Sequence, residues 1–345
     1  MEMMKAAIYK GLKQIEVQQV EKRAPDPGYV ILDTKRTGIC GSDLHNYFGN
    51  WAPSNTVAAG HETCGVVAEV GEGVTAFEIG DKVTAECFSH CGQCTYCRTG
   101  YYNHCQERRW ISDKTHGGFA EFTTVHTSGL FKLPDNMSFE DGVMVEPLAV
   151  SYRAMVQADA THQDRVAIIG GGTIGQLCLA AAKAMGVKET IITAKYDQQI
   201  QLAHDLGADH VVDIRETDLQ TCAKDLTDGL GVDVVIETVG GSQNFDTALD
   251  AVRKCGTVVL VAGYHKPLEV NLARIVWSEI VVTGSNCYGF SNMQTDFDAA
   301  IELIDSGRVE AKKLVTHRFP FDEIAEAFRI SADKSLGAVK VHVCQ

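Results

Sequence analysis

The chain lacks any long apolar run that could cross a membrane. No segment approaches the roughly 18 consecutive apolar residues that a spanning helix needs. The N-terminal stretch, MEMMKAAIYKG, also lacks the apolar core of a secretory signal peptide. We therefore expect a cytoplasmic protein that has no membrane partner.

Basic residues are scarce relative to acidic ones. The 345 residues include 31 Lys and Arg against 45 Asp and Glu, which gives a formal net charge of −14. A phosphate backbone or an anionic membrane is bound by a positively charged face, so this balance argues against a nucleic-acid or membrane partner. The sequence also has no low-complexity run and no evident internal repeat. We expect an ordinary globular protein.

Cysteine is plentiful, but a metal site explains it better than disulfides do. Four of the twelve cysteines crowd into CGQCTYCRTGYYNHC, in a large chain without a secretory signal. The spacing C-x2-C-x2-C-x7-C predicts a closed tetrahedral zinc site with a structural role, whose ligands are Cys91, Cys94, Cys97 and Cys105. The alternatives are an iron–sulfur cluster, whose bacterial spacing differs after the third cysteine, and unmetallated thiols. We expect the scattered cysteines to be reduced and buried: Cys64, Cys178, Cys222, Cys255 and Cys344.

Length and pattern together predict two domains. The first 150 residues hold short β-branched runs between turn signals, which indicate a β-rich domain. From Val150 onward, strand and helix signals alternate, and six strands with intervening helices predict an α/β fold with a doubly wound parallel sheet. After Ser285 the pattern changes to a helix, then a strand and a helix. We expect the final strand, AVKVHV, to rejoin the first domain.

The segment VAIIGGGTIG predicts a dinucleotide site. Gly170, Gly172 and Gly175 have G-x-G-x-x-G spacing between a strand and a helix. The first glycine permits a tight turn, the second lets the backbone approach a pyrophosphate, and the third lets the helix pack on the strand. The glycines alone would be weak evidence, but the strand, the helix and the five further strands strengthen the prediction.

A second set of metal-binding residue types is dispersed along the chain. GICGSDLH contains Cys40, Ser42, Asp43 and His45; AGHETCG contains His61 and Glu62; VMVEPLAV contains Glu146. Each residue taken singly has an ordinary interpretation, such as a small core cysteine, a turn histidine or a solvated acid. The residues alone do not distinguish a site from these alternatives.

The order of these motifs resembles that of the zinc-dependent medium-chain alcohol dehydrogenases. GICGSDLH, GHETCGVVAEVG, the four-cysteine loop, VEPLAVSYRAM, the glycine loop and LVTHRFPFDEIAEAF are all present in that order. The chain looks most like the polyol branch, which contains sorbitol, xylitol and butanediol dehydrogenases. The resemblance implies a GroES-like β-barrel catalytic domain (1–151 and 287–345) and a Rossmann cofactor domain (152–286).

The resemblance also implies a catalytic zinc, in addition to the structural one. Cys40 and His61 would be ligands, and the third would be Glu62 or Glu146, which the sequence does not rank. Asp43 would orient the imidazole of His61. Zinc would lower the pKa of a bound alcohol, Ser42 would take its proton, and the cofactor ribose would pass that proton toward His45. Hydride would leave for the nicotinamide.

Residues after the sheet strands are assigned to the cofactor by the same resemblance. The assigned set is Gly170, Gly172, Thr173, Ile174, Gly175, Ala194, Lys195, Val239, Val261, Gly263, Ser285 and Cys287. Ala194 stands where an acid normally accepts hydrogen bonds from the adenosine ribose of NAD. The missing carboxylate removes repulsion of a 2′-phosphate and Lys195 adds a cation, so we expect NADP(H) to be favoured over NAD(H). The alternatives are that Lys195 is a solvated loop residue, or that Asp197 replaces the missing acid.

Substrate and assembly are less constrained by the sequence. Cys287 stands where polyol enzymes usually carry an arginine, and Asn46, followed by Tyr47, replaces an aromatic residue, so both changes are expected in the substrate pocket. Candidate walls of that pocket are Trp51, Trp110 and Phe122. We expect a secondary-alcohol, polyol or sugar-type substrate. The alternatives are an NADPH-dependent ketone or aldehyde reductase, a threonine-type dehydrogenase and a non-catalytic zinc-binding relative.

The strand EIVVTGS would form an open sheet edge, which favours a homodimer or homotetramer.

Overall fold

The polypeptide folds into two units, each with its own core. The computed structural model describes residues 2–51 and 53–345. Unit 1 comprises Met1–Glu146, Asn292–Asp305 and Val315–Gln345, and unit 2 comprises Pro147–Ser291 and Ser306–Leu314. These bounds differ from the domain limits expected from the sequence at 147–151, 287–291 and 306–314.

Unit 1 is built mainly from antiparallel strands. Its strands are β1 (Met3–Gly11), β2 (Gln14–Glu21), β3 (Tyr29–Gly38), β4 (Glu62–Val70), β5 (Lys82–Ala85), β6 (Phe88–Ser89), β7 (Arg109–Trp110), β8 (Phe122–His126), β9 (Leu130–Lys132), β17 (Gln294–Thr295), β18 (Val315–Pro320) and β19 (Lys340–Cys344). Seven of them form one sheet in the order β18-β19-β3-β4-β5-β9, with β8 also paired to β3. β1 and β2 form a separate hairpin.

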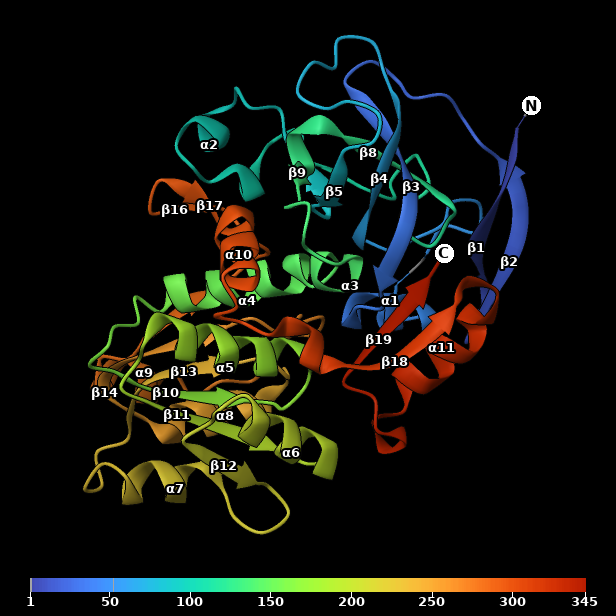
Figure 1. The fold of residues 1–345 in the computed structure, drawn as a ribbon. Helices are drawn as coiled ribbons and strands as arrows, with labels where there is room; N and C mark the ends of the chain where they lie inside the picture. The colour runs from blue at the N-terminus through green and yellow to red at the C-terminus, as the bar shows by residue number, and fades with distance from the viewer. Residues whose placement is uncertain (1, 52) are drawn as a thin grey trace. The chain divides into compact units, whose positions relative to one another are not determined.

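The β-branched run in β3 explains why this strand is central. Val30 and Leu32 are buried with Val67, Val83 and Val125 from the neighbouring strands in one apolar cluster. The last strand of the chain, β19, pairs with β3, and Figure 1 shows it in red beside the blue N-terminal strands. The expectation that the final strand rejoins the first domain is therefore confirmed.

Short helices connect and cover the strands of unit 1. They are α1 (Gly41–Tyr47), α2 (Thr95–Arg98), η1 (Tyr102–His104), η2 (Thr127–Gly129), α3 (Phe139–Gly142), α10 (Asp296–Asp305), η4 (Phe321–Glu323), α11 (Ile324–Ala332) and η5 (Lys334–Leu336); α4 (Val145–Gln157) begins at the end of the first segment. α1 and α11 pack against a second apolar cluster that includes Ile8, Tyr47, Phe119 and Phe328.

Unit 2 contains the predicted parallel sheet. Its strands are β10 (Arg165–Ile169), β11 (Glu189–Ala194), β12 (His210–Asp213), β13 (Val232–Glu237), β14 (Val252–Leu260), β15 (Val281–Gly284) and the short β16 (Phe290–Ser291). The six longer strands run parallel in the order β12-β11-β10-β13-β14-β15. This order is the doubly wound one of dinucleotide-binding folds, so the predicted fold class is confirmed.

Helices flank the parallel sheet. They are α5 (Thr173–Met185), α6 (Asp197–Asp205), α7 (Leu219–Asp225), α8 (Ser242–Ala251), α9 (Leu272–Ser278) and η3 (Ala311–Leu314). Leu219 of α7 and Phe245 and Ala248 of α8 bury one face of the sheet over Ala167 and Val235. In the part of the chain that the structure describes, no helix combines the length and apolarity that a membrane crossing requires.

Candidate active site and metal centres

Unit 1 brings together three residues that are dispersed in the sequence and can bind a metal. Cys40 lies at the N-cap of α1, directly after β3, and Glu62 begins β4. Gly38 and Glu62 are register partners in the antiparallel β3–β4 pair, so the two strand ends meet. One ligand atom each from Cys40, His61 and Glu62 lies within 4.8 Å of the others. Glu146 is not a member of this group, although it is buried and interacts electrostatically with His61.

Buried carboxylates determine the charge around His61. Burial lowers the pKa of His61, but the negative charges of Cys40, Asp43 and Glu146 raise it well above its ordinary value. Burial raises the pKa of Asp43 to about 6, opposed by His61. Asp43 Oδ2 accepts a hydrogen bond from the backbone N–H of Cys40 at 2.9 Å, so it also fixes the start of α1. Burial raises the pKa of Glu146 too.

Four sulfurs gather in the predicted cysteine loop. The Sγ–Sγ distances are 3.5 Å for Cys94 and Cys97, 3.9 Å for Cys91 and Cys97, and 4.0 Å for Cys94 and Cys105. Four sulfurs at about 2.3 Å from a zinc ion form a tetrahedron with edges of about 3.8 Å, so the loop has the dimensions of a zinc site. Backbone N–H groups of Cys91, Cys94 and Glu107 point at these sulfurs.

The glycine loop in unit 2 has the geometry that its spacing predicts. Gly170 follows β10 with a φ of 109°, and a Cβ on Gly175 would lie 1.7 Å from the carbonyl oxygen of Gly170. No side chain fits at Gly175, so α5 approaches the strand closely only because this residue is glycine. Gly172 is the N-cap of α5, and Thr173 and Ile174 form its first turn.

The remaining residues assigned to the cofactor lie at the same edge of the sheet. Ala194, Val239, Val261 and Ser285 end or follow β11, β13, β14 and β15, so all lie at the carboxyl ends of parallel strands. In open parallel sheets this edge is where ligands bind. Lys195, Gly263 and Cys287 belong to the same loops.

Comparisons with known proteins agree with this arrangement. Residues 26–135 match the family described as alcohol dehydrogenase GroES-like domain, and residues 173–306 match zinc-binding dehydrogenase. Sorbitol dehydrogenase of Halalkalibacterium halodurans is 36% identical over 327 residues, covering 93% of each chain. A zinc-binding dehydrogenase of Sinorhizobium meliloti bound to NADP superposes with a TM-score of 0.89 at 28% identity, over 100% of both chains. An alcohol dehydrogenase of Escherichia coli CFT073 complexed with NADH gives 0.90 at 26%, over 99% of both.

The chain belongs to the zinc-dependent medium-chain dehydrogenases. It falls in their polyol dehydrogenase-like branch, and it is an enzyme of the alcohol or polyol dehydrogenase class. The donor sets fit the metal of this family, because thiolate, imidazole and carboxylate groups are all zinc ligands. The GroES-like domain predicted from the sequence is likewise confirmed by the match.

A buried lysine lies beside the candidate zinc ligands of this dehydrogenase. The sequence analysis did not predict it. Lys340 of β19 forms an ion pair with Glu62, and each residue is 1% exposed. The Nζ of Lys340 also donates to the carbonyl oxygen of Ile39 at 3.2 Å. A signal was present, because a lysine inside an alternating apolar strand needs a buried acid as partner. The partner itself could not be read from the sequence.

A buried carboxylate at the cofactor edge was also missed. Glu237 ends β13 with no exposed surface, and its Oε1 accepts hydrogen bonds of 2.7 Å from the N–H groups of Val239 and Gly240. The hydroxyl of Tyr264 donates to its other oxygen. Glu237 therefore ties the loop after β13 to the loop after β14.

The candidate proton-relay residues share α1. Ser42 and His45 are three residues apart, which places them on one face of the helix. Nδ1 of His45 lies 3.2 Å from Nδ2 of Asn50, and the His45 ring lies 5.1 Å from that of Trp51. Trp51 therefore lies beside His45, one of the two candidate relay residues.

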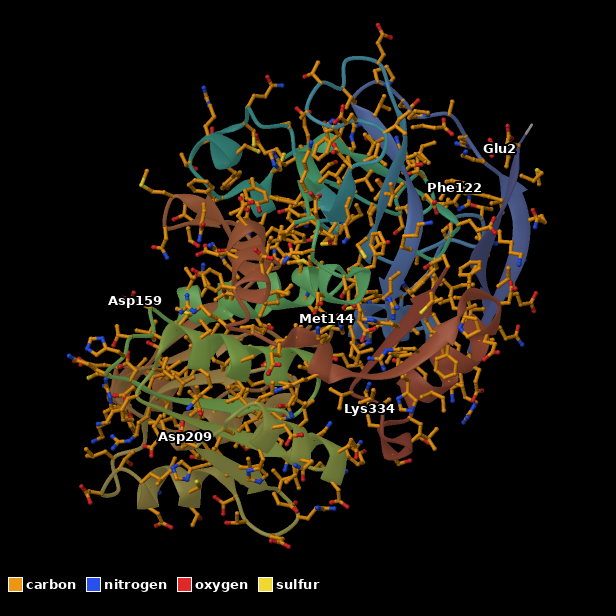
Figure 2. All side chains as sticks on the ribbon, viewed as in Figure 1. Glu2, Phe122, Met144, Asp159, Asp209 and Lys334 are labelled. Carbon is orange, nitrogen blue, oxygen red and sulfur yellow. The ribbon has the colours of Figure 1, made fainter. Side chains whose placement is uncertain are left out.

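Two other aromatic residues named as candidate pocket walls line cavities of unit 1. Trp110 lines a cavity of about 360 Å³ with Tyr29 and His126, and Phe122, labelled in Figure 2, lines a smaller neighbouring one. Neither cavity is lined by a candidate zinc ligand, so the expected place of these two residues in the substrate pocket gains no support. Tyr47 is buried against Phe328 in the core.

The five scattered cysteines expected to be buried differ in their exposure. Cys64 and Cys178 are buried as expected, but Cys222 and Cys344 are partly exposed and Cys255 is exposed, so that expectation was wrong for these three. Cys255 lies within β14, at an irregular part of its pairing with β13, where its φ is 57° and its side chain is exposed. Asp197 is the first residue of α6 and Tyr196 is its N-cap.

Proposed function

We propose that this enzyme transfers a hydride between NADP(H) and a secondary alcohol of polyol or sugar type. The observation that carries the proposal is the grouping of Cys40, His61 and Glu62 within 4.8 Å, beside buried Asp43 and Glu146. A soft thiolate, an imidazole and a carboxylate form a mixed donor set, and three protein ligands leave a coordination position open for substrate.

Glu62 is proposed as the third zinc ligand. Its carboxylate lies in the group with Cys40 and His61, whereas that of Glu146 does not. When bound, zinc at this site supplies the Lewis acidity that makes an alcohol easier to deprotonate. Charged residues of the chain surround this position. The ammonium group of Lys340 neutralises the carboxylate of Glu62, and the negative charges of Asp43 and Glu146 favour a positive charge near His61.

Ser42 and His45 are proposed to move the proton. The Ser42 hydroxyl accepts it from the substrate, and His45, on the same face of α1, receives it and releases it to water. The nicotinamide supplies the hydride chemistry, and the glycine loop with the loops after β13 and β14 holds the cofactor. The second zinc is proposed to have only a structural role in the loop of Cys91, Cys94, Cys97 and Cys105.

The cofactor proposal depends on Ala194. Ala194 is 2% exposed at the end of β11, and it offers no carboxylate to the adenosine ribose. The Sinorhizobium meliloti neighbour was solved with NADP and the Escherichia coli one with NADH, so both cofactors are compatible with this fold. The absent acid and the adjacent Lys195 favour NADP(H) for this chain.

A homodimer or homotetramer is proposed on physical grounds. β15 is the last strand of the unit 2 sheet, and its open edge offers unpaired backbone groups. Val281 of β15 and Leu272, Val276 and Trp277 of the preceding helix α9 are all exposed. An apolar surface next to an open strand edge suits a second copy of the chain.

Metal analysis and steady-state kinetics test the proposal together. We expect two zinc ions per chain in the wild type, and one in Cys40→Ser with turnover reduced at least about a hundredfold. A panel of polyols, sugars and secondary alcohols with each cofactor should give the highest kcat/KM with a polyol and NADP. One zinc per chain in the wild type, or no turnover of any alcohol, would contradict the proposal.

A further inference from the structure

The acid missing at position 194 has counterparts on the neighbouring elements. Ala194 and Asp213 are register partners in the parallel β11–β12 pair, so a carboxylate stands one strand away at the same sheet edge. Asp197, at the start of α6, supplies a second one. Both carboxylates are engaged by the guanidinium of Arg215, which follows β12.

Arg215 is held in place mainly by Asp213. Its Nε lies 2.9 Å and 3.1 Å from the two carboxylate oxygens of Asp213, and its Nη2 lies 2.6 Å from Oδ2. The backbone N–H of Arg215 donates to Asp213 Oδ1 at 2.9 Å as well. The turn is closed by hydrogen bonds from the N–H groups of Glu216 and Thr217 to the Asp213 carbonyl. The guanidinium is therefore oriented before any ligand binds.

The contact with Asp197 is different in kind. Nη2 of Arg215 lies 2.7 Å from Asp197 Oδ1, but the Asp197 side chain is 87% exposed, against 18% for Asp213. Exposed ion pairs contribute little because water solvates both partners well. A phosphate group carries more charge and more acceptor oxygens than a carboxylate, and it matches the planar guanidinium fork. Asp197 is thus a weakly held anion that a phosphate can replace.

We propose that Arg215 binds the adenosine 2′-phosphate of NADP by exchanging Asp197 for that phosphate, while Asp213 keeps the guanidinium oriented. The proposal rests on the proposed use of NADP. Lys195, at the end of the adjacent strand, adds a second cation. Loss of Arg215 should weaken NADP binding, because it removes the group that binds the phosphate and leaves Asp213 and Asp197 to repel it. The same loss should favour NAD, because the two carboxylates can then accept hydrogen bonds from ribose hydroxyls.

Two nucleotides that differ only in the 2′-phosphate isolate this contact. Isothermal titration of adenosine 2′,5′-bisphosphate and of 5′-AMP would be performed on the wild type, Arg215→Gln and Arg253→Gln. Arg253 is the matched control, because it also pairs with an aspartate, Asp233, but near the amino end of the sheet. We expect Arg215→Gln to weaken bisphosphate binding by about tenfold or more, with 5′-AMP binding equal or tighter. Arg253→Gln should leave both affinities unchanged.

The outcomes separate this inference from the proposed cofactor preference. If the wild type binds 5′-AMP as tightly as the bisphosphate, the NADP proposal fails. If the wild type prefers the bisphosphate and Arg215→Gln keeps that preference, the assignment to Arg215 is overturned while NADP use stands.

A second variant tests the exchange without removing the arginine. Asp197→Asn removes the competing anion from an exposed side chain and leaves Asp213 and Arg215 in place. It should bind the bisphosphate several-fold more tightly than the wild type, with 5′-AMP binding unchanged. An unchanged or weaker affinity for the bisphosphate would overturn the exchange of Asp197 for phosphate, even if Arg215→Gln itself did not fold.

Discussion

Lys340 lies on the last strand of the chain, yet its ammonium group meets the carboxylate that begins β4. Both groups are out of water, where an unbalanced charge is costly and a balanced pair is tolerated. The pair therefore matters most when one partner is removed. Lys340 also donates to the Ile39 carbonyl next to Cys40, so it connects the final strand to the start of the candidate zinc site.

Lys340→Met should destabilise the protein because it leaves Glu62 charged and buried without a partner. In chelator-treated protein, where no metal offsets that charge, we expect a loss of about 3–5 kcal/mol of unfolding free energy. The double variant Lys340→Met/Glu62→Gln should lose clearly less than Lys340→Met alone. Urea denaturation provides the measurement. Lys313→Met is the matched control, because Lys313 pairs with Glu310 in solvent and should lose under about 1 kcal/mol. Equal losses for both lysines would refute the argument.

Some site residues are predictable from the sequence because their spacing itself carries the geometry. The glycines of the loop and the four cysteines lie close together along the chain, so a few local turns determine their arrangement. Lys340 is different, because its partner Glu62 lies on another strand. Arg215 and Glu237 bond to near neighbours in the sequence, but their contacts with Asp197 and Tyr264 join separate elements. A strand register or a loop closure decides those contacts, and neither is written in the local pattern.

At the scale of elements, the cysteine loop has little regular structure of its own. α2 spans four residues and η1 three, and α2 buries none of its side chains. Hydrogen bonds from the N–H groups of Cys97 and Gln106 lower the pKa of Cys94, which favours the thiolate that a metal needs. η1 buries Tyr102 and Asn103, so it is the part of the loop around α2 that depends on the sulfur cluster for order.

Cys94→Ser should release one zinc ion per chain and loosen this loop. A hydroxyl is a poor replacement for a thiolate, so the remaining three sulfurs hold the metal weakly. We expect the zinc content to fall from two to one, and limited trypsin digestion to cleave at Arg98 or Arg108 several times faster than in the wild type. Cys255→Ser, at an exposed position of β14, serves as the control and should change neither readout. Retention of two zinc ions by Cys94→Ser would contradict the assignment of this site.

Elements with strong periodic patterns were predictable, and weakly patterned ones were not. The six strands of the parallel sheet, α10 and the pair β18 and α11 follow from apolar runs or helical periodicity. β2, with the sequence QIEVQQVE, was missed because it has few apolar residues, and its hairpin pairing with β1 stabilises it. α1 was missed because its seven residues are mostly polar, and its start is fixed by Asp43 and by packing against α11.

For the molecule as a whole, the two units divide the chemistry. The candidate zinc ligands and relay residues belong to unit 1, and the residues assigned to the cofactor belong to unit 2. Residues 306–314 belong to unit 2, although the segments on either side of them belong to unit 1. The amino-acid composition does not reveal these two changes of unit. The chain-wide charge of −14 is compatible with a small-molecule enzyme. Unit 2 exposes several large apolar side chains at the edge formed by α9 and β15.

Trp277→Glu should dissociate the proposed oligomer. Trp277 of α9 is 84% exposed beside the open edge of β15, and a carboxylate buried at an interface there would lack a partner. Sedimentation velocity should show the wild type as a dimer or tetramer and Trp277→Glu as a monomer at the same micromolar concentration. Leu230→Glu is the matched control, since Leu230 is 72% exposed in a loop away from β15 in the sheet order, and it should leave the assembly intact. A monomeric wild type, or a Trp277→Glu variant that still assembles, would show that this edge is not the interface.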